Sequence, residues 1–248
     1  MTANYFRLSH SKLQAFDRCR KLYWFRYVSG EPWPEEAPNP AGCVGTGVHR
    51  GLKTLCDTGD TADGASALDV YLRMPAHACA GPGTEAYREA FALYARGCEA
   101  HASIASEERW AELDTWAPWR SRGLNVRARI DRVDRLAGDG WQIIDWKTGT
   151  YEDDSSVDQQ LDLGHVAARV SLQLGREARV TAVAWNLRTG QRRLRELRQG
   201  DAEATMQRLA NLADRLQGMT AFTATPGPHC GFCAWRPQCM EAEAATWE

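Results

Sequence analysis

Two neighbouring segments with the composition of β-strands constrain the fold of this chain more than any other feature. Residues 124–136 and 141–147 are rich in β-branched side chains and partly alternate between apolar and polar residues. Residues 137–140, which lie between them, read Ala-Gly-Asp-Gly, a strong turn signal. We therefore expect a β-hairpin whose two strands belong to a central sheet.

Helical patterns lie on both sides of this hairpin along the chain. The predicted helices cover residues 9–28, 44–55, 85–111, 157–174 and 201–216. Residues 179–187 and 191–197 are further predicted strands, and residues 30–42 are a predicted loop. Residues 58–83 are small, polar and interrupted by prolines, and no helix or strand is assigned to them. The chain has 248 residues, 44% of them hydrophobic, which is sufficient for a sizeable core. Helices around a small mixed central sheet give an α/β fold.

The charge and hydropathy of the chain exclude two classes of protein. The formal net charge is −2 and the sequence pI is about 6.3, so any contact with a nucleic acid must come from local basic clusters. No stretch reaches the roughly 18 consecutive apolar residues of a membrane helix, and residues 1–16 lack the apolar core of a secretory signal. We expect a cytoplasmic protein that does not bind membranes.

The predicted hairpin brings two carboxylates and one ammonium group together. Asp145 and Lys147 lie two residues apart on one strand and therefore point to the same face, and the turn places Asp131 almost opposite Asp145. Such a carboxylate pair suits Mg²⁺ or Mn²⁺, and a lysine beside it balances charge that builds on a phosphoryl group. Ordinary salt bridges of these residues with Arg129, Arg132 or Lys147 are the alternative.

The hairpin resembles the core of the PD-(D/E)XK nuclease superfamily in its RecB-like branch. The matching stretches are Ile-Asp-Arg-Val around Asp131 and Ile-Ile-Asp-Trp-Lys-Thr-Gly around Asp145 and Lys147. The family also has a histidine after a Gly-x-x-x-His stretch, which His49 matches. The resemblance implies a restriction-endonuclease-like core with Lys147, Asp131 and Asp145 as catalytic residues. It implies a Mg²⁺ or Mn²⁺ ion held by His49, Asp131, Asp145 and the main-chain carbonyl of Trp146.

Two other motifs of the family match this chain only in part. On the helix after the hairpin, Gln160 fits the start of the family's Gln-x-x-x-Tyr motif and is a candidate DNA contact. Gly164 stands at the tyrosine position, and the following His165 is the candidate substitute for the aromatic side chain. A glutamate that often precedes the first strand of the family aligns loosely with Glu112.

Three cysteines near the C-terminus, Cys230, Cys233 and Cys239, have the spacing of metal ligands. A closed site of four thiolates needs one more ligand, and Cys19 is the candidate. Zinc and iron–sulfur clusters both accept four cysteines, so the spacing does not distinguish them, and free thiols are a third alternative. One distant cysteine followed by Cys-x2-Cys-x5-Cys resembles the iron–sulfur RecB-like nucleases. This resemblance implies a 4Fe–4S cluster that joins the N- and C-terminal segments.

Arginines form two local clusters that suit contacts with phosphate. Arg127 and Arg129 precede the predicted metal ligands and are candidate DNA contacts. The second cluster consists of Arg188, Arg192, Arg193, Arg195 and Arg198. Leucines alternate with these arginines, so a solvated face of a strand or helix is the alternative.

By this resemblance, residues 1–248 form a single nuclease domain. Residues 40–220 are its predicted core, and residues 1–30 and 225–248 together form the cluster-binding part. The sequence has no helicase phosphate loop, so we expect a stand-alone exonuclease that acts on DNA ends or single strands. The expected setting is recombination or repair, phage DNA metabolism or CRISPR spacer processing, with recombination or CRISPR adaptation proteins as partners in a prokaryotic or phage-infected cell. A catalytically silent DNA-binding or adaptor protein and a zinc-stabilised structural protein are the alternatives.

Overall fold

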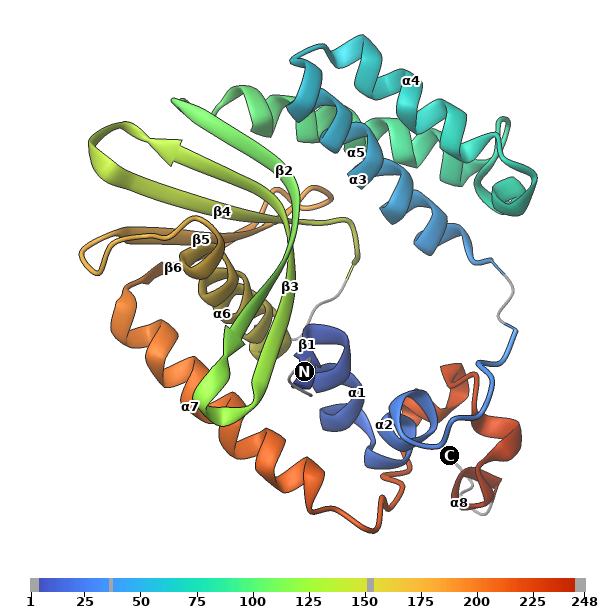
Figure 1. Cartoon of the computed structure of the whole chain (residues 1–248). Coiled ribbons are helices and arrows are strands. Elements are labelled where there is room, and N and C mark those ends of the chain that lie inside the picture. Colours follow the sequence, from blue (N-terminus) through green and yellow to red (C-terminus); the bar gives the residue numbers. More distant parts are fainter. Residues whose placement is uncertain (1–4, 36–37, 151–153, 244–248) are drawn as a thin grey trace. The chain divides into compact units, whose positions relative to one another are not determined.

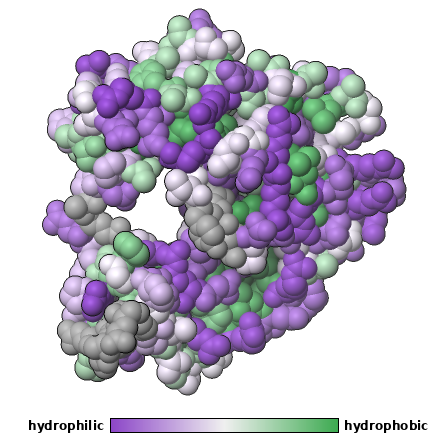
Figure 2. Space-filling model, turned by 180° about the vertical axis from the view of Figure 1, so that it is seen from behind, coloured by the Kyte–Doolittle hydropathy of each residue, from purple (hydrophilic) through white to green (hydrophobic). Residues whose placement is uncertain are grey.

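The computed structural model describes residues 5–35, 38–150 and 154–243. The chain forms two compact units. The larger unit consists of residues 38–117 and 126–207, and the smaller one of residues 1–37, 118–125 and 208–248. In the part of the chain that is described, no helix is long and apolar enough to cross a membrane. The surface in view in Figure 2 is mostly hydrophilic, with hydrophobic residues in small groups.

A mixed sheet forms the centre of the larger unit (Figure 1). Its strands in this unit are β2 (Glu108–Trp119), β3 (Leu124–Leu136), β4 (Gly140–Lys147), β5 (Arg179–Asn186) and β6 (Arg192–Leu197). The ends of β2 and β3 that meet at residues 118–125 belong to the smaller unit, as does β1, the sixth strand of the sheet (Phe6–Ser9). β4 pairs antiparallel with β3 and parallel with β5, and β6 runs antiparallel to β5. β2 pairs with β3. The predicted hairpin and the two further predicted strands are confirmed.

The hairpin turn has a backbone that suits its sequence. Gly138 and Asp139 both lie in the left-handed region, with φ of 71° and 59°. Glycine reaches this region at little cost, and aspartate tolerates it better than most residues. The turn sets a register in which Leu136 faces Gly140. At the other end of the pairing, Arg132 faces Ile144. The next residue of β3, Asp131, therefore comes opposite Asp145 of β4.

Three helices cover one face of the sheet (Figure 1). They are α3 (Pro40–Thr58), α4 (Thr61–Leu72) and α5 (Glu85–Ala102). Their apolar side chains form one core with Ile144 and Trp146 of β4. The face of β4 that carries these two residues is therefore buried against the helical layer.

Glycines in α3 and α4 allow close approach between the helices of this layer. A Cβ at Gly47 would lie 2.8 Å from Leu68 Cδ1 of α4, and one at Gly51 would lie 3.0 Å from the Gly64 carbonyl oxygen. Neither position leaves room for a side chain. This tight packing holds α3, and with it His49, in a defined position in the larger unit.

α6 (Asp154–Ser171) covers the other face of the sheet and packs on β4 and β5. A Cβ at Gly164 would lie 3.2 Å from Ile143 Cδ1, and Ile143 and Ile144 point to opposite faces of β4 because side chains alternate along a strand. The mixed central sheet is thus flanked by helices, which confirms the predicted α/β fold.

The smaller unit joins segments that are far apart in the sequence. They include β1 (Phe6–Ser9), α1 (His10–Arg18), α2 (Arg20–Tyr27), the last part of α7 (Gln199–Gln217), the short 3-10 helices η4 (Pro228–Phe232) and η5 (Arg236–Gln238), and α8 (Met240–Glu243). The rings of Phe25 and Trp235 stack with their centroids 4.9 Å apart. Trp235 is fully buried, so this stack is part of the core of the smaller unit.

Three predicted elements differ from the structure. The helix predicted over residues 9–28 is interrupted at Cys19, whose extended backbone (φ −163°, ψ 120°) separates α1 from α2. The helix predicted over residues 85–111 is too long, since the segment after α5 leads into β2. Residues 58–83, to which no element was assigned, contain α4, whose N-terminus is capped by Asp60. β2 is stabilised by pairing with β3, and α4 by packing against α3. Both contacts are with other elements, so the local sequence pattern was insufficient to predict β2 and α4.

Candidate functional site

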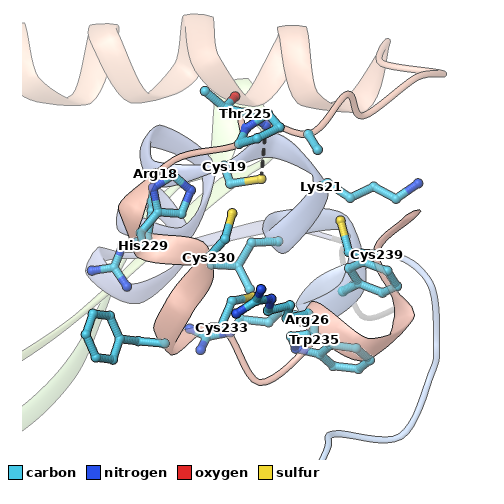
Figure 3. A pocket seen from close by; sticks show the side chains of 16 residues that line it. Arg18, Cys19, Lys21, Arg26, Thr225, His229, Cys230, Cys233, Trp235 and Cys239 are labelled. Carbon is cyan, nitrogen blue, oxygen red and sulfur yellow. Dashed lines mark hydrogen bonds between the residues drawn. The ribbon is translucent and has the colours of Figure 1, made fainter. Parts of the chain in front are cut away.

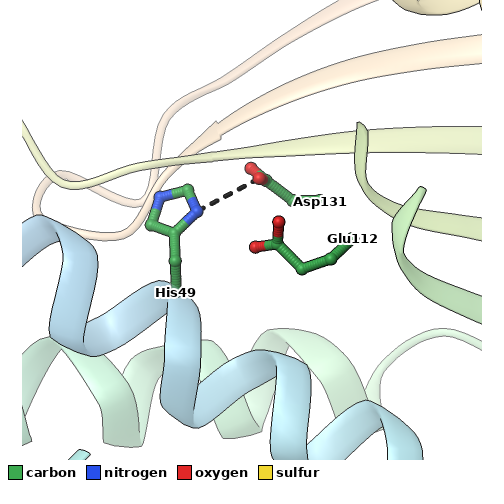
Figure 4. A group of neighbouring side chains, drawn as sticks. All are labelled: His49, Glu112 and Asp131. Atoms are coloured by element: carbon green, nitrogen blue, oxygen red, sulfur yellow. Dashed lines mark hydrogen bonds and ion pairs between the residues drawn. The ribbon is translucent and has the colours of Figure 1, made fainter. Parts of the chain in front are cut away.

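Three side chains from three elements converge in the larger unit (Figure 4). His49 projects from α3, Glu112 from β2 and Asp131 from β3. One ligand atom of each lies within 4.8 Å of the others. His49 Nδ1 lies 3.1 Å from Asp131 Oδ1, and the Trp146 N–H donates to Asp131 Oδ2 over 2.7 Å. An imidazole and two carboxylates this close together can hold a divalent cation.

Glu112 enters this group through an unusual backbone conformation. Its φ is 50°, in the left-handed region that residues with a side chain rarely adopt. Its carboxylate is nearly buried and forms an ion pair with Arg129. Backbone strain of this kind clusters at functional sites. The loose alignment of Glu112 with a family glutamate was the one sequence signal for this residue, and the structure places it in the group.

The charges around His49 favour its protonated form. Burial lowers the pKa of an imidazole, but the Asp131 carboxylate, helped by Asp145 and Glu112, outweighs burial and raises the pKa of His49 to about 9. The same surplus of negative charge attracts a cation. A bound metal ion would take the place of the proton, since imidazole binds metals in its neutral form.

Asp145, Lys147 and Gln160 contact one another in the same unit. Lys147 Nζ lies 3.0 Å from Asp145 Oδ2 and donates to Gln160 Oε1 over 2.8 Å. The Gln160 amide in turn donates to Asp145 Oδ1. Asp145 and Lys147 belong to β4 and Gln160 belongs to α6. The helix on this face of the sheet therefore orients both charged groups of β4.

The charge of Asp145 is costly to maintain in this environment. Burial raises the pKa of Asp145 to about 7, and the Asp131 carboxylate adds to the effect, whereas Lys147 opposes it. Two buried carboxylates near each other repel unless positive charge lies between or beside them. The site is thus one that a bound cation would stabilise.

The structure brings the predicted active-site residues into one unit, but not as one set of ligands. Asp145 is not among the mutually close ligand atoms found in the described residues, and its oxygens contact Lys147 and Gln160 instead. Glu112 takes the third position beside His49 and Asp131. Metal binding by Asp145 and by the Trp146 carbonyl stays a prediction.

The motif on α6 departs from the family pattern for a structural reason. Gly164, at the tyrosine position, lies against Ile143, so that a large side chain would not fit there without a shift of the helix. His165 is 1% exposed, and burial lowers its pKa to about 4. The expectation that His165 substitutes for a DNA-contacting aromatic is wrong, because its ring lies in the core.

The two arginines predicted to contact DNA are both engaged in ion pairs. Arg127 Nε donates to Asp114 Oδ1 over 2.8 Å, and Arg129 pairs with Glu112. The Arg129 side chain is nevertheless 65% exposed. Contact of either arginine with DNA stays a prediction.

A second candidate site is a pocket in the smaller unit that is lined by four cysteines (Figure 3). Cys19 lies between α1 and α2, Cys230 lies in η4, and Cys233 and Cys239 follow η4 and η5. Cys19, Cys230 and Cys239 are buried. The four residues that the sequence spacing singles out therefore surround one pocket.

The surroundings of this pocket suit a group with negative charge. Four basic residues line it, namely Arg18, Lys21, Arg26 and Arg236. The Thr225 N–H donates to Cys19 Sγ over 3.4 Å. Positive charge and N–H donors both stabilise thiolates. Among the described residues, no three cysteine sulfurs lie within 4.8 Å of one another.

Comparison with known families agrees with the geometry of the larger unit. The model of the PD-(D/E)XK nuclease superfamily matches residues 7–240. The chain belongs to this superfamily. Together with the group of His49, Glu112 and Asp131, this membership identifies the chain as a nuclease, a phosphodiester hydrolase. No curated protein matches the chain at a significant level.

Two solved structures resemble the chain to different degrees. A crystal structure described as a "putative exonuclease" from Eubacterium rectale has a TM-score of 0.55 and 10% sequence identity, over 99% of this chain and 90% of that one. At this identity the likeness shows a shared fold. The protein SSO0001 has a TM-score of 0.38 and 16% identity, over 90% of this chain and 94% of that one. A TM-score this low supports no further conclusion.

Proposed function

We propose that this protein is a metal-dependent deoxyribonuclease of the RecB-like branch that acts on DNA ends or single strands. The observation that carries the proposal is the presence of two charged groups in one unit. The first is the imidazole–carboxylate group of His49, Glu112 and Asp131, and the second is the ion pair of Lys147 with Asp145. A cation site together with a lysine is suited to stabilise the charge that develops on a phosphoryl group during hydrolysis.

In this proposal, His49, Glu112 and Asp131 hold a Mg²⁺ or Mn²⁺ ion, and Asp145 and the Trp146 carbonyl are further ligands. Carboxylate and carbonyl oxygens are the ligands that these hard cations prefer. When bound, the ion supplies Lewis-acid polarisation of the phosphoryl oxygen and makes a water more acidic. The raised pKa of Asp145 supports the fit, because it is caused first by burial and then by the nearby Asp131 carboxylate, and a bound cation would stabilise the ionised form of both groups.

Lys147 is the proposed catalytic residue that contacts the phosphate. Its ammonium group is held by Asp145 and Gln160, from two different elements. A group whose direction is preset in this way costs little reorganisation when charge develops next to it. Gln160 is thus a positioning residue in this proposal, in addition to the DNA contact expected from its motif.

Activity on DNA ends is the finer part of the proposal. The shared fold with the Eubacterium rectale structure, which is described as a "putative exonuclease", supports it. The test uses single- and double-stranded DNA labelled at one end, with free or blocked ends, in Mg²⁺, Mn²⁺ or EDTA. We expect progressive loss from free ends only when metal is present. Equal cleavage of circular DNA would contradict the exonuclease assignment.

A matched pair of variants on the hairpin tests the site itself. Asp131→Asn removes a proposed metal ligand, whereas Asp139→Asn changes an aspartate in the turn at the other end of the hairpin. We expect Asp131→Asn to lower cleavage by at least about 100-fold and to weaken Mn²⁺ binding measured by titration calorimetry. Asp139→Asn should leave both unchanged. Full activity of Asp131→Asn would refute the assignment.

We further propose that Cys19, Cys230, Cys233 and Cys239 hold a 4Fe–4S cluster. The basic lining of the pocket and the N–H donor to Cys19 support a site that holds thiolates, and the choice of a cluster over zinc rests on the resemblance of the cysteine spacing. Anaerobically purified protein is expected to be brown and to contain iron and acid-labile sulfide. Colourless protein with one zinc per chain would overturn this assignment, and the nuclease proposal would stand.

The proposed cluster has a structural role that matches the predicted domain organisation. Residues 1–30 and 225–248 would form the cluster-binding part, with residues 40–220 as the nuclease core. The grouping of segments from both ends of the chain in the smaller unit supports this division. We propose a cytoplasmic nuclease of recombination or repair, phage DNA metabolism or CRISPR spacer processing, with DNA and recombination or CRISPR adaptation proteins as partners.

A further inference from the structure

A pocket of about 480 Å³ opens in the larger unit where β5 ends. Its walls are the C-terminal half of α5, the end of β5 and the turn that leads to β6. Arg96, Arg188 and Arg192 line it, and Glu99 is the acidic residue of the lining. The pocket is thus basic, although the whole chain carries a negative net charge.

The Arg192 guanidinium lies over the indole ring of Trp185. The two residues face each other across β5 and β6, and Arg192 Cζ lies 3.4 Å from the ring centroid. A guanidinium group stacked through its face keeps its N–H donors available in its plane, which is the geometry that binds phosphate oxygens. Within the described residues, Arg192 has no ion pair, whereas Arg193 and Arg195 of the same strand pair with aspartates of α6.

Arg96 is anchored to the other side of the pocket. Its Nη1 donates to the main-chain carbonyls of Leu187 and Arg188. It forms no ion pair with any residue in the described ranges. Arg188 differs, because it pairs with Glu89 and donates to the Thr148 carbonyl over 3.1 Å. Arg188 therefore shapes the pocket, and Arg96 and Arg192 supply the available charge.

The pocket adjoins the end of the strand that carries Lys147. The Leu187 N–H donates to the Lys147 carbonyl over 2.8 Å, and the Arg188 guanidinium donates to the next carbonyl, that of Thr148. β4 and β5 are parallel, so both end at the same edge of the sheet. Ligands of α/β proteins bind preferentially outside such carboxyl ends.

We propose that this pocket binds a backbone phosphate of the DNA strand through Arg96 and Arg192. The inference rests on the proposed nuclease function and adds a DNA contact outside the metal-binding group. Trp185 is a positioning residue, since its indole holds Arg192 in one orientation. Because the contact is with phosphate, it is independent of base sequence and sensitive to salt.

The test measures binding of a fluorescent oligothymidine by anisotropy, in EDTA to prevent cleavage, over a series of KCl concentrations. The variants are Arg96→Gln, Arg192→Gln and Arg192→Lys. The control is Arg176→Gln, which removes a highly exposed arginine of the same unit that pairs with Glu203. Each glutamine variant in the pocket should weaken binding about five- to tenfold. It should also reduce the slope of log K against log salt by about one.

Arg192→Lys distinguishes a lost phosphate contact from misfolding, because it keeps the positive charge. This variant should retain the slope of log K against log salt and lose only part of the affinity for the oligonucleotide. The loss of affinity in the glutamine variants should be the same for an oligonucleotide with hydroxyl groups at both ends. A loss seen only with a phosphorylated end would overturn the assignment to a backbone phosphate.

If Arg96→Gln and Arg192→Gln both match the control in affinity and salt slope, the pocket does not bind DNA. Metal-dependent cleavage by the wild-type protein would then show that the nuclease proposal survives. A wild-type protein that neither binds nor cuts DNA would instead refute the proposed function itself.

Discussion

Replacement of Gln160 by methionine separates two roles that this residue can have. Methionine has a similar length and no hydrogen-bonding amide, so the change removes the contacts of Gln160 with Lys147 and Asp145 with little change in volume. If Gln160 positions these groups, the variant loses cleavage rate. If Gln160 mainly contacts DNA, as its motif predicts, the variant loses DNA affinity instead.

The structure gives the size of the expected loss. A hydrogen bond to a charged group contributes about 1.5–3 kcal/mol. Gln160 makes two such bonds, but the direct contact of Lys147 with Asp145 at 3.0 Å remains in the variant, and water can replace part of what is lost. We therefore expect a loss equivalent to one bond, which is about a 10- to 150-fold decrease in the rate of the chemical step.

The assay is single-turnover cleavage of end-labelled single-stranded DNA in Mn²⁺, combined with DNA affinity measured in EDTA. Gln159→Met, the same change at the adjacent position of α6, is the matched control and should cleave at the wild-type rate. We expect the affinity of Gln160→Met for DNA to stay within about twofold of wild type, since the contacts that it loses are internal. A cleavage rate within about twofold of wild type, or a defect confined to affinity, would refute the positioning role.

Three further predictions concern stability. Asp134 and Arg132 form a fully buried ion pair with three hydrogen bonds. Asp134→Ala should therefore lower the free energy of unfolding, measured by urea titration, by about 3–5 kcal/mol. A decrease of less than about 1 kcal/mol would contradict this prediction. Burial, helped by Arg169, lowers the pKa of His165 to about 4. The contribution of His165 to the free energy of unfolding is therefore fully present above pH 6.5 and falls by about 2 kcal/mol by pH 5, because the unfolded state takes up a proton. His165→Gln should weaken the pH dependence of stability by this amount. Gly164→Tyr should destabilise the protein by at least about 1–3 kcal/mol because its side chain meets Ile143, whereas an unchanged melting temperature would show that α6 can move away from the sheet.

The sequence alone determined the hairpin and the charged residues on it. The turn at residues 137–140 and the alternation in the two flanking segments are short-range signals, and the register follows from them. Asp131, Asp145 and Lys147 were therefore predictable as neighbours. Their resemblance to a nuclease motif, together with the Gly-x-x-x-His stretch, led to His49 as well. Cysteine spacing likewise singled out four residues that line one pocket.

The side chains that complete these sites were decided only by the tertiary structure. Glu112 reaches His49 because β2 pairs with β3 and because the backbone of Glu112 itself is left-handed. The local sequence did not indicate this strand, since its Ala- and Glu-rich pattern predicted a helix over residues 85–111. Gln160 contacts Asp145 because α6 packs on β4.

The arginine pocket has the same origin. The sequence did not distinguish the five arginines of the second cluster, but their tertiary contacts differ. Strand alternation turns Arg193 and Arg195 toward the aspartates of α6 and leaves Arg192 on Trp185, near Arg96 of α5. Short-range signals specify turns, strands and spacings, whereas the partner of each charged group depends on which distant element packs against it.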